Sequence, residues 1–247
     1  MDQPSGLRRG TAFRGTVVPP EPAIKRAYTF LDGQNLFFAV KEALRCEYPN
    51  YDPIKLSEEI CRMKNRQLSG IYFYTGLPSA KDDPFWNRFW SKKLAVLRTR
   101  GVKTYGRELR YHKTKITLSD GTVTYAVSPK EKGIDVRLAL DAVRLARENQ
   151  LDVAVIFSQD QDFTEVVKEI KRISIQQSRW IRVACAFPIS RSSPNTRDID
   201  GTEWISIDKI LYDSCIDTND YRPKKAGRNA CGNDFFGGLI DGKRREG

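Results

Sequence analysis

Leu151-Asp152-Val153-Ala154-Val155-Ile156-Phe157, followed directly by Ser158-Gln159-Asp160-Gln161-Asp162-Phe163, is the stretch that decides the fold of this 247-residue chain. A continuous apolar run of this length, rich in β-branched residues, predicts a strand that is buried on both faces. Comparable apolar runs occur at residues 27–31, 70–74 and 180–187. Between the runs, apolar residues recur at helical spacing over residues 34–46, 55–66, 84–100, 134–148 and 162–177. The alternation predicts parallel β-α units and a doubly wound α/β fold.

The segment from Val102 to Tyr125 departs from this alternation. It has the pattern of extended chain, with an Asp120-Gly121 turn between two short β-branched runs, and this pattern predicts a β-hairpin. We therefore expect a Rossmann-like three-layer sandwich, in which a central, mainly parallel sheet lies between helices and carries an inserted hairpin.

Composition divides the chain into three parts. Residues 1–25 are basic and rich in Pro and Gly, which predicts a disordered basic N-terminal tail. Residues 26–216 hold all the apolar runs and are expected to form one domain, whereas residues 217–247 are polar and Gly-rich and predict a disordered C-terminal tail. The formal net charge is +11, so a basic body of this kind favours a polyanionic partner.

Several classes of protein are excluded by what the sequence lacks. No run of eighteen apolar residues is present and the N-terminus has no apolar segment, so we expect neither a membrane-spanning helix nor a secretory signal. The five cysteines are widely spaced and His112 is the single histidine, which argues against a disulfide framework, a zinc ribbon and a Ser-His-Asp triad. The P-loop and dinucleotide-binding glycine patterns are absent. We expect a cytoplasmic protein in which oxygen atoms hold any metal.

Carboxylates follow the predicted strands where ligands usually bind an open α/β sheet. Asp32 ends the first apolar run, and Asp160 and Asp162 follow the run that ends at Phe157. Asp135 lies in the first turn of the helix that precedes that run, and a crossover helix begins at the carboxyl end of the sheet. Each acid alone is explained equally well as a turn or helix-capping residue. Their coincidence from three segments at one edge is what predicts a site.

Four carboxylates at one edge require a cation. Two unit charges about 4 Å apart repel by roughly 4 kcal/mol at an effective dielectric constant near 20. Mg²⁺ and Mn²⁺ are hard ions that prefer carboxylate and water oxygens, and magnesium keeps waters that a phosphate oxygen can replace. The predicted metal ligands are therefore Asp32, Asp135, Asp160 and Asp162.

Three segments together resemble a known family: Phe30–Leu36 (FLDGQNL), Glu131–Val136 (EKGIDV) and Phe157–Phe163 (FSQDQDF). In this order, and over about residues 27–212, they resemble the signature motifs of NYN domains, especially those of the LabA-like branch. The resemblance implies a PIN-like fold, a Mg²⁺ or Mn²⁺ site at the four aspartates, and ribonuclease activity, with endonucleolytic cleavage favoured. Gln159 departs from the family, which usually has Gly or Asn there.

A metal-dependent hydrolysis of RNA gives further residues a role. Asn35 is expected to orient the attacking water or a phosphate oxygen, and Ser158 to fix Asp160 or Asp162 by a hydrogen bond. Basic residues near this edge are the candidate RNA contacts, although a solvated charged hairpin would have the same composition. They are Lys130, Lys132, Arg107, Arg110, Lys113 and Lys115.

Three alternatives stay open at this point. A catalytically silent RNA-binding or regulatory protein would carry the same acids and the same basic surface. A different Mg²⁺-dependent phosphotransfer enzyme is disfavoured, because Asp32 is not part of an Asp-x-Asp sequence. A partner-binding module would use an exposed aromatic helix, but the stripe at that helix is more typical of a core or an oligomer contact, so a homo-oligomer is compatible with it. The stripe consists of Trp86, Phe89, Trp90, Leu94 and Leu97.

Overall fold

A central six-stranded parallel sheet organises the computed structural model of the chain, which describes residues 19–223 except 47, 118–121, 131–132 and 191–198. The strand order is β3-β2-β1-β6-β7-β8, and every neighbouring pair is parallel. The strands are β1 (Arg26–Asp32), β2 (Gln67–Leu77), β3 (Lys103–Glu108), β6 (Val153–Phe157), β7 (Arg182–Pro188) and β8 (Glu203–Ile207). The predicted α/β class with a central parallel sheet is confirmed.

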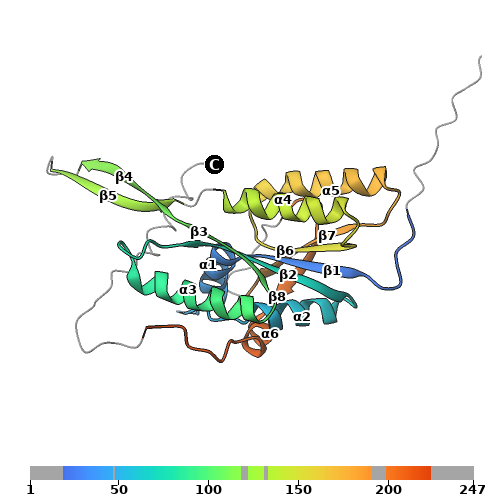
Figure 1. Cartoon of the computed structure of the whole chain (residues 1–247), viewed down its shortest axis with the longest axis horizontal. Helices are drawn as coiled ribbons and strands as arrows, with labels where there is room; N and C mark the ends of the chain where they lie inside the picture. The colour runs from blue at the N-terminus through green and yellow to red at the C-terminus, as the bar shows by residue number, and fades with distance from the viewer. Residues whose placement is uncertain (1–18, 47, 118–121, 131–132, 191–198, 224–247) are drawn as a thin grey trace, which may run out of the picture.

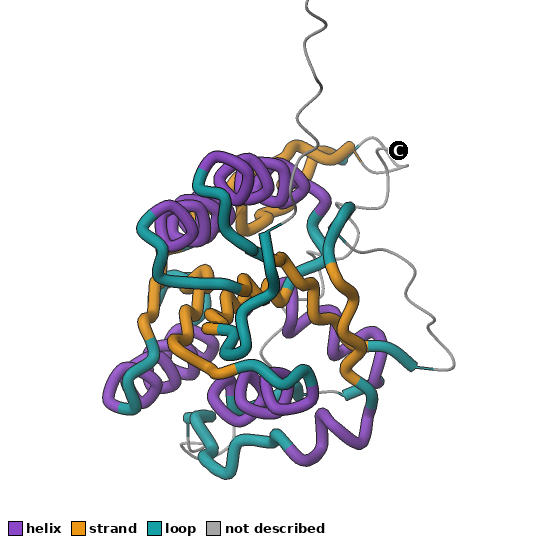
Figure 2. Tube along the Cα trace, turned by 90° about the vertical axis from the view of Figure 1, so that its right-hand side faces the viewer, coloured by secondary structure: helices purple, strands orange, loops and turns teal. Residues whose placement is uncertain are grey.

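Helices cover both faces of the sheet, as Figures 1 and 2 show. One face carries α1 (Gly33–Leu44), α2 (Pro53–Met63), α3 (Pro84–Thr99) and the short α6 (Lys209–Ser214). The other face carries α4 (Ile134–Arg147) and α5 (Thr164–Gln176), and a 3₁₀ turn, η1 (Gln161–Phe163), leads into α5. Because each crossover helix returns along the sheet, the helices α1, α4 and α5 begin at the edge where β1 and β6 end.

Two apolar cores follow from this layering. Successive side chains of a strand point to opposite faces, so Leu31 packs with α1, α2 and α3, while Phe30 packs with α4 and α5. The aromatic stripe of α3 belongs to the first core, since Phe89 and Trp90 are almost fully buried there. The burial of this stripe removes the surface that a partner-binding module would need, and none of the helices within the described ranges is long and apolar enough to cross a membrane.

The predicted hairpin is present as β4 (Arg110–Thr117) and β5 (Val123–Lys130), an antiparallel pair separate from the main sheet. β3 runs directly into β4, so the hairpin leaves the sheet at the carboxyl end of the strands and projects beyond it in Figure 1. The predicted Asp120-Gly121 turn lies outside the described residues. The strand β8 and the helix α6 were not predicted, because β8 has no continuous apolar run and six residues are too few for helical periodicity.

The chain after residue 216, where we expected a tail to begin, still packs against the body. Asp217 and Tyr221 are buried, and the backbone amide of Asp217 donates to the carbonyl of Asn50 at 2.8 Å. Tyr51 and Ile216 form an isolated antiparallel bridge. The packed part of the domain therefore extends to Tyr221, and the expected N-terminal tail lies largely outside the described residues.

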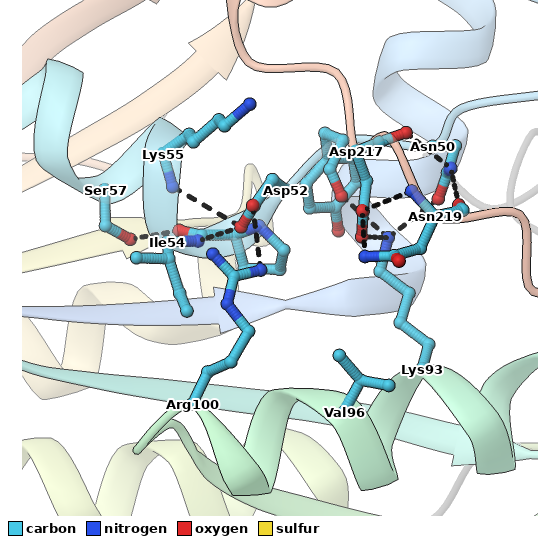
Figure 3. Close-up of polar contacts among 12 residues, drawn as sticks. Asn50, Asp52, Ile54, Lys55, Ser57, Lys93, Val96, Arg100, Asp217 and Asn219 are labelled. Carbon is cyan, nitrogen blue, oxygen red and sulfur yellow. Dashed lines mark hydrogen bonds and ion pairs between the residues drawn. The ribbon is translucent and has the colours of Figure 1, made fainter.

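A buried polar network holds this C-terminal segment, as Figure 3 shows. The amine of Lys93, which is 1% exposed, donates to Asn50 Oδ1 at 3.0 Å and to the Tyr51 carbonyl at 2.7 Å, and lies 3.9 Å from Asp217 Oδ2. Arg100 Nη1 lies 2.9 Å from Asp52 Oδ2. Burial lowers the pKa of Lys93 to about 8, although Asp217 and Asp52 act in the opposite direction.

Candidate active site

Asp32 is the last residue of β1 and the N-cap of α1. Its Oδ1 accepts a hydrogen bond from the amide of Asn35 at 3.0 Å, so the side chain points toward the helix N-terminus and is 5% exposed. Gly33 follows because the helix begins against β2: a Cβ there would lie 2.6 Å from the ring of Phe73 and 2.9 Å from the carbonyl of Tyr74. The strand–helix junction therefore fixes Asp32 at the carboxyl end of the sheet.

Asp160 and Asp162 follow β6, the neighbour of β1. Leu31 and Phe157 are partners in the parallel register, so Asp32 and Ser158 begin the two loops side by side. Asp160 is half-buried and its Oδ1 accepts from the amide of Asp162 at 3.1 Å, which caps the 3₁₀ turn η1. Asp162 is exposed. The structure thus places three of the four predicted carboxylates on adjoining loops.

Asn35 joins these two loops. While its backbone amide donates to Asp32, its Oδ1 accepts from the amide of Gln159 at 3.2 Å. Ser158 Oγ accepts from the amide of Asp160 at 3.2 Å, so it contacts the backbone of the acidic loop. Both residues hold the loop that carries Asp160, which is a positioning role that the sequence predicted only in part.

Asp135 stands on a different element, in the first turn of α4. The N-cap of that helix is Gly133, whose φ of +80° lies in the left-handed region. The guanidinium of Arg107, at the end of β3, lies against this glycine: its Nη1 is 2.6 Å from the position that a Cβ would take. Arg107 is exposed, so a predicted RNA-contacting cation lies at the same helix terminus as Asp135.

The chemistry of these donors fits a hard divalent ion, since all four are carboxylates at one edge of the sheet. Their side chains do not form a ready ligand set, because within the described residues no three His, Cys, Asp or Glu side chains are grouped to hold one metal ion. Two of the carboxylates instead cap the turns that follow their strands. Metal ligation by these residues accordingly stays a prediction.

The predicted basic surface is described only in part. Arg107 and Lys115 are exposed, whereas Lys132 and the side chains of Lys130, Arg110 and Lys113 lie outside the described residues. The backbones of the two hairpin strands are described, and these strands project from the edge of the sheet that carries the aspartates (Figure 1).

Near this edge, a second acidic residue of α4 has a different role. Asp141 is buried and accepts from the Tyr74 hydroxyl at 3.0 Å, from Arg137 Nε at 2.9 Å and from Arg144 Nη2 at 3.4 Å. Burial, reinforced by the adjacent Asp141 charge, raises the pKa of Tyr74 far above its usual value. Tyr74 therefore stays protonated, and this group ties α4 to the sheet.

Comparison with known proteins identifies the family of this chain. The NYN domain matches residues 26–178, which is more than half of the chain. The chain belongs to the NYN domain family. The match ends after α5, although β7 and β8 continue the sheet to Ile207. NYN domains have a PIN-like nuclease fold and are generally ribonucleases. The membership therefore supports a nuclease fold with RNA as the substrate class.

Two further comparisons add no second family. None of the curated proteins matches the NYN chain. Among solved structures, the crystal structure of a protein of unknown function from Vibrio parahaemolyticus RIMD 2210633 is 18% identical, covers 77% of this chain and 98% of that chain, and has a TM-score of 0.45.

Sequence reasoning missed one polar group at this edge. Gln34, the second residue of α1, is buried, and its Nε2 has no hydrogen-bond partner among the described residues. This amide lies 2.9 Å from the position of a Cβ at Gly76, at the end of β2. Its position directly after Asp32-Gly33 was the signal in the sequence. A buried residue that only packs against its neighbours could occupy the same position.

Proposed function

We propose that this NYN domain is a divalent-metal-dependent ribonuclease that hydrolyses RNA phosphodiester bonds at the edge formed by the ends of β1 and β6. One observation supports it most: in a chain of a family that is generally ribonucleolytic, Asp32 and the Asp160 loop follow neighbouring parallel strands and are joined through Asn35. The order of the motifs leads us to place the chain in the LabA-like branch and to favour endonucleolytic cleavage.

The metal would be Mg²⁺ or Mn²⁺, held by Asp32, Asp160 and Asp162 with Asp135 from α4. When bound, such an ion supplies Lewis acidity toward a phosphodiester and neutralises the charge that develops on it. Asn35 keeps the two acidic loops in register, and Ser158 holds the backbone of Asp160. Arg107, beside the N-terminus of α4, attracts an RNA phosphate to the edge.

The exposed Lys115 of the hairpin and the formal net charge of +11 support RNA as the partner. A cytoplasmic location is part of the same proposal. It is supported by Cys46, Cys61, Cys185 and Cys215, which are free thiols in the described part of the chain and would persist in a reducing compartment.

The test compares Asp160→Asn with the wild type on labelled RNA in Mg²⁺ and in Mn²⁺. Loss of one carboxylate from the reacting centre should reduce the cleavage rate on the order of 100-fold or more. Mn²⁺ binding, measured by electron paramagnetic resonance without RNA, should weaken in the same variant. Asp200→Asn is the matched control, because Asp200 is exposed and lies in the turn before β8, at the opposite end of the sheet.

The competing function is RNA binding without cleavage. It is favoured by the lack of a ready three-carboxylate group within the described residues. Tight RNA binding by the wild type, with no cleavage in either metal and no attenuation of the spectrum of free Mn²⁺, would establish it and refute the nuclease. Equal cleavage by wild type and Asp160→Asn would show that the reaction occurs elsewhere.

A further inference from the structure

A concave site lies at the end of the sheet opposite the aspartates. It is a cavity of about 530 Å³ at the entrances of β2, β7 and β8, with the later turns of α5 as one wall. A volume of this size is within the range of roughly 300–1,000 Å³ that small-molecule sites occupy. The loops that carry Asp32 and Asp160 are at the other ends of the strands, so this cavity is separate from the candidate active site.

The lining of the cavity is strongly cationic. Five basic residues and two acidic residues line it, which leaves a net charge of 5 − 2 = +3. The basic residues are Lys25, Lys64, Arg66, Lys171 and Arg182, and the acidic residues are Glu21 and Glu203. Such a concave cationic surface concentrates anions.

Both acids are already neutralised by neighbours. Glu21 pairs with Lys25 at 2.8 Å, while Glu203 pairs with Lys64 at 3.1 Å and also with Arg66. Burial would raise the pKa of Glu203, but the charges of Arg66 and Lys64 outweigh it, so the pKa lies below its usual value. Glu203 is therefore ionised at neutral pH and neutralises only part of the local positive charge.

Two cations remain without such a neighbour. Within the described residues, Lys171 and Arg182 form no ion pair with a carboxylate, and both are exposed at the cavity. The guanidinium of Arg182 lies 5.7 Å from the ring centroid of Trp180, so a flat cationic and aromatic wall adjoins the charged floor. A wall of this kind suits the ring of a nucleotide.

Arg66 is the most informative residue of the lining. Its side chain is 5% exposed, and its Nη1 is buried with no hydrogen-bond partner among the described residues. The other terminal nitrogen, Nη2, pairs with Glu203 at the start of β8, a strand four positions away from β2 in the sheet. A buried guanidinium with an unused donor is costly, and an oxyanion is the acceptor that satisfies it best.

We propose that this cavity binds a nucleotide phosphate, either of a free nucleotide or of RNA, through Arg66 and Lys171, with the nucleotide ring against Trp180. The two sources present the same phosphate chemistry to the cavity. The unused Nη1 of Arg66 is the donor that this proposal assigns to a phosphate oxygen.

Isothermal titration calorimetry at low salt tests the proposal with pyrophosphate, ADP and a five-nucleotide RNA. Loss of one charge-assisted hydrogen bond in Lys171→Gln should weaken binding of the ligand that occupies the cavity about tenfold. Lys168→Gln is the matched control, because Lys168 is an exposed lysine of the same helix that pairs with Glu165 outside the cavity. It should leave the affinity unchanged.

Arg66→Lys probes the buried donor while keeping the charge beside Glu203, and it should also weaken binding about tenfold. Should it fail to fold, the surface variant Arg182→Gln takes its place. If ADP and pyrophosphate bind and Lys171→Gln weakens their binding, the ligand is a free nucleotide. If only the RNA binds and Lys171→Gln weakens its binding, the ligand is an RNA strand. No binding of any probe, or equal affinity for Lys171→Gln and Lys168→Gln, would overturn the proposal.

Discussion

Two groups of carboxylates in this NYN domain have different surroundings. In the interior, Asp52 and Asp217 lie beside the cations Arg100 and Lys93 (Figure 3). At the carboxyl end of the sheet, Asp32 and Asp160 accept from backbone amides of the turns that they cap. Cationic side chains neutralise the interior group, whereas backbone amides of the capped turns donate to the edge group.

The contrast separates stability from function. A buried charge must be paired, because leaving one partner alone costs about 3–5 kcal/mol. A capping carboxylate contributes typically about 1 kcal/mol and is replaced by Asn at little cost, since Asn also accepts from the backbone. We therefore expect substitutions of the interior group to unfold the domain and substitutions at the edge to change its chemistry.

The largest expected effect is that of Asp217→Ala. It removes the acceptor of Tyr221 and Asn219 and leaves Lys93 buried without its nearest carboxylate, so the free energy of unfolding should fall by about 3 kcal/mol. Urea denaturation measures it. Asp213→Ala is the control, because its pairing with Lys209 is exposed. Should Asp217→Ala be as stable as the control, the interior network would not hold the C-terminal segment.

The interior group should also make stability depend on pH. The pKa of Lys93 is about 8 in the folded protein and 10.5 ordinarily, so between these values the unfolded chain binds more protons. Stability from this group therefore rises with pH in that window, by about 2 kcal/mol from pH 8 to 9.5.

The measurement compares the wild type with Lys93→Met by urea denaturation at pH 7.5 and 9.5. Asp217, Asp52, Arg100, Tyr51 and Tyr221 surround the amine, and they are common to both proteins, so their own titration largely cancels in the difference. The free energy of unfolding of the wild type should increase relative to that of Lys93→Met as the pH rises. A constant difference would mean that Lys93 keeps its proton throughout.

At the edge, Asn35→Ala removes the acceptor of the Gln159 amide and loosens the loop of Asp160. Positioning residues of this kind typically account for about 10-fold in activity, so cleavage should fall by about that factor while RNA binding stays the same. Asn87→Ala is the control, since it also loses one side-chain hydrogen bond, from Nδ2 to the Pro78 carbonyl. Equal cleavage rates in the two variants would remove Asn35 from the site.

The smallest expected effect is the difference between substitutions at two glycines. Gly133 and Gly101 both have positive φ, +80° and +85°, so alanine at either position should cost about 1 kcal/mol of stability. Only at Gly133 does the new Cβ displace Arg107, because nothing lies within 4 Å of the one at Gly101. RNA affinity, measured by fluorescence anisotropy, should therefore fall in Gly133→Ala alone. A parallel loss in both would show that Arg107 does not contact RNA.

Much of the fold could be predicted from local pattern. The apolar runs that end at Leu31 and Phe157 predicted β1 and β6, and the acids that follow them were placed at the correct edge, because parallel strands end together. Helical periodicity found α1 to α5, and the turn signal found the hairpin. These features depend on residues close in sequence, so the amino-acid order alone determines them.

Only the tertiary structure decided which charges meet. Arg66 reaches Glu203 across 137 positions of sequence, and Asn50 and Lys93 meet a segment that composition assigned to a tail. No periodicity encodes such contacts, because the side-chain directions and the burial that shape them arise only when the whole chain packs.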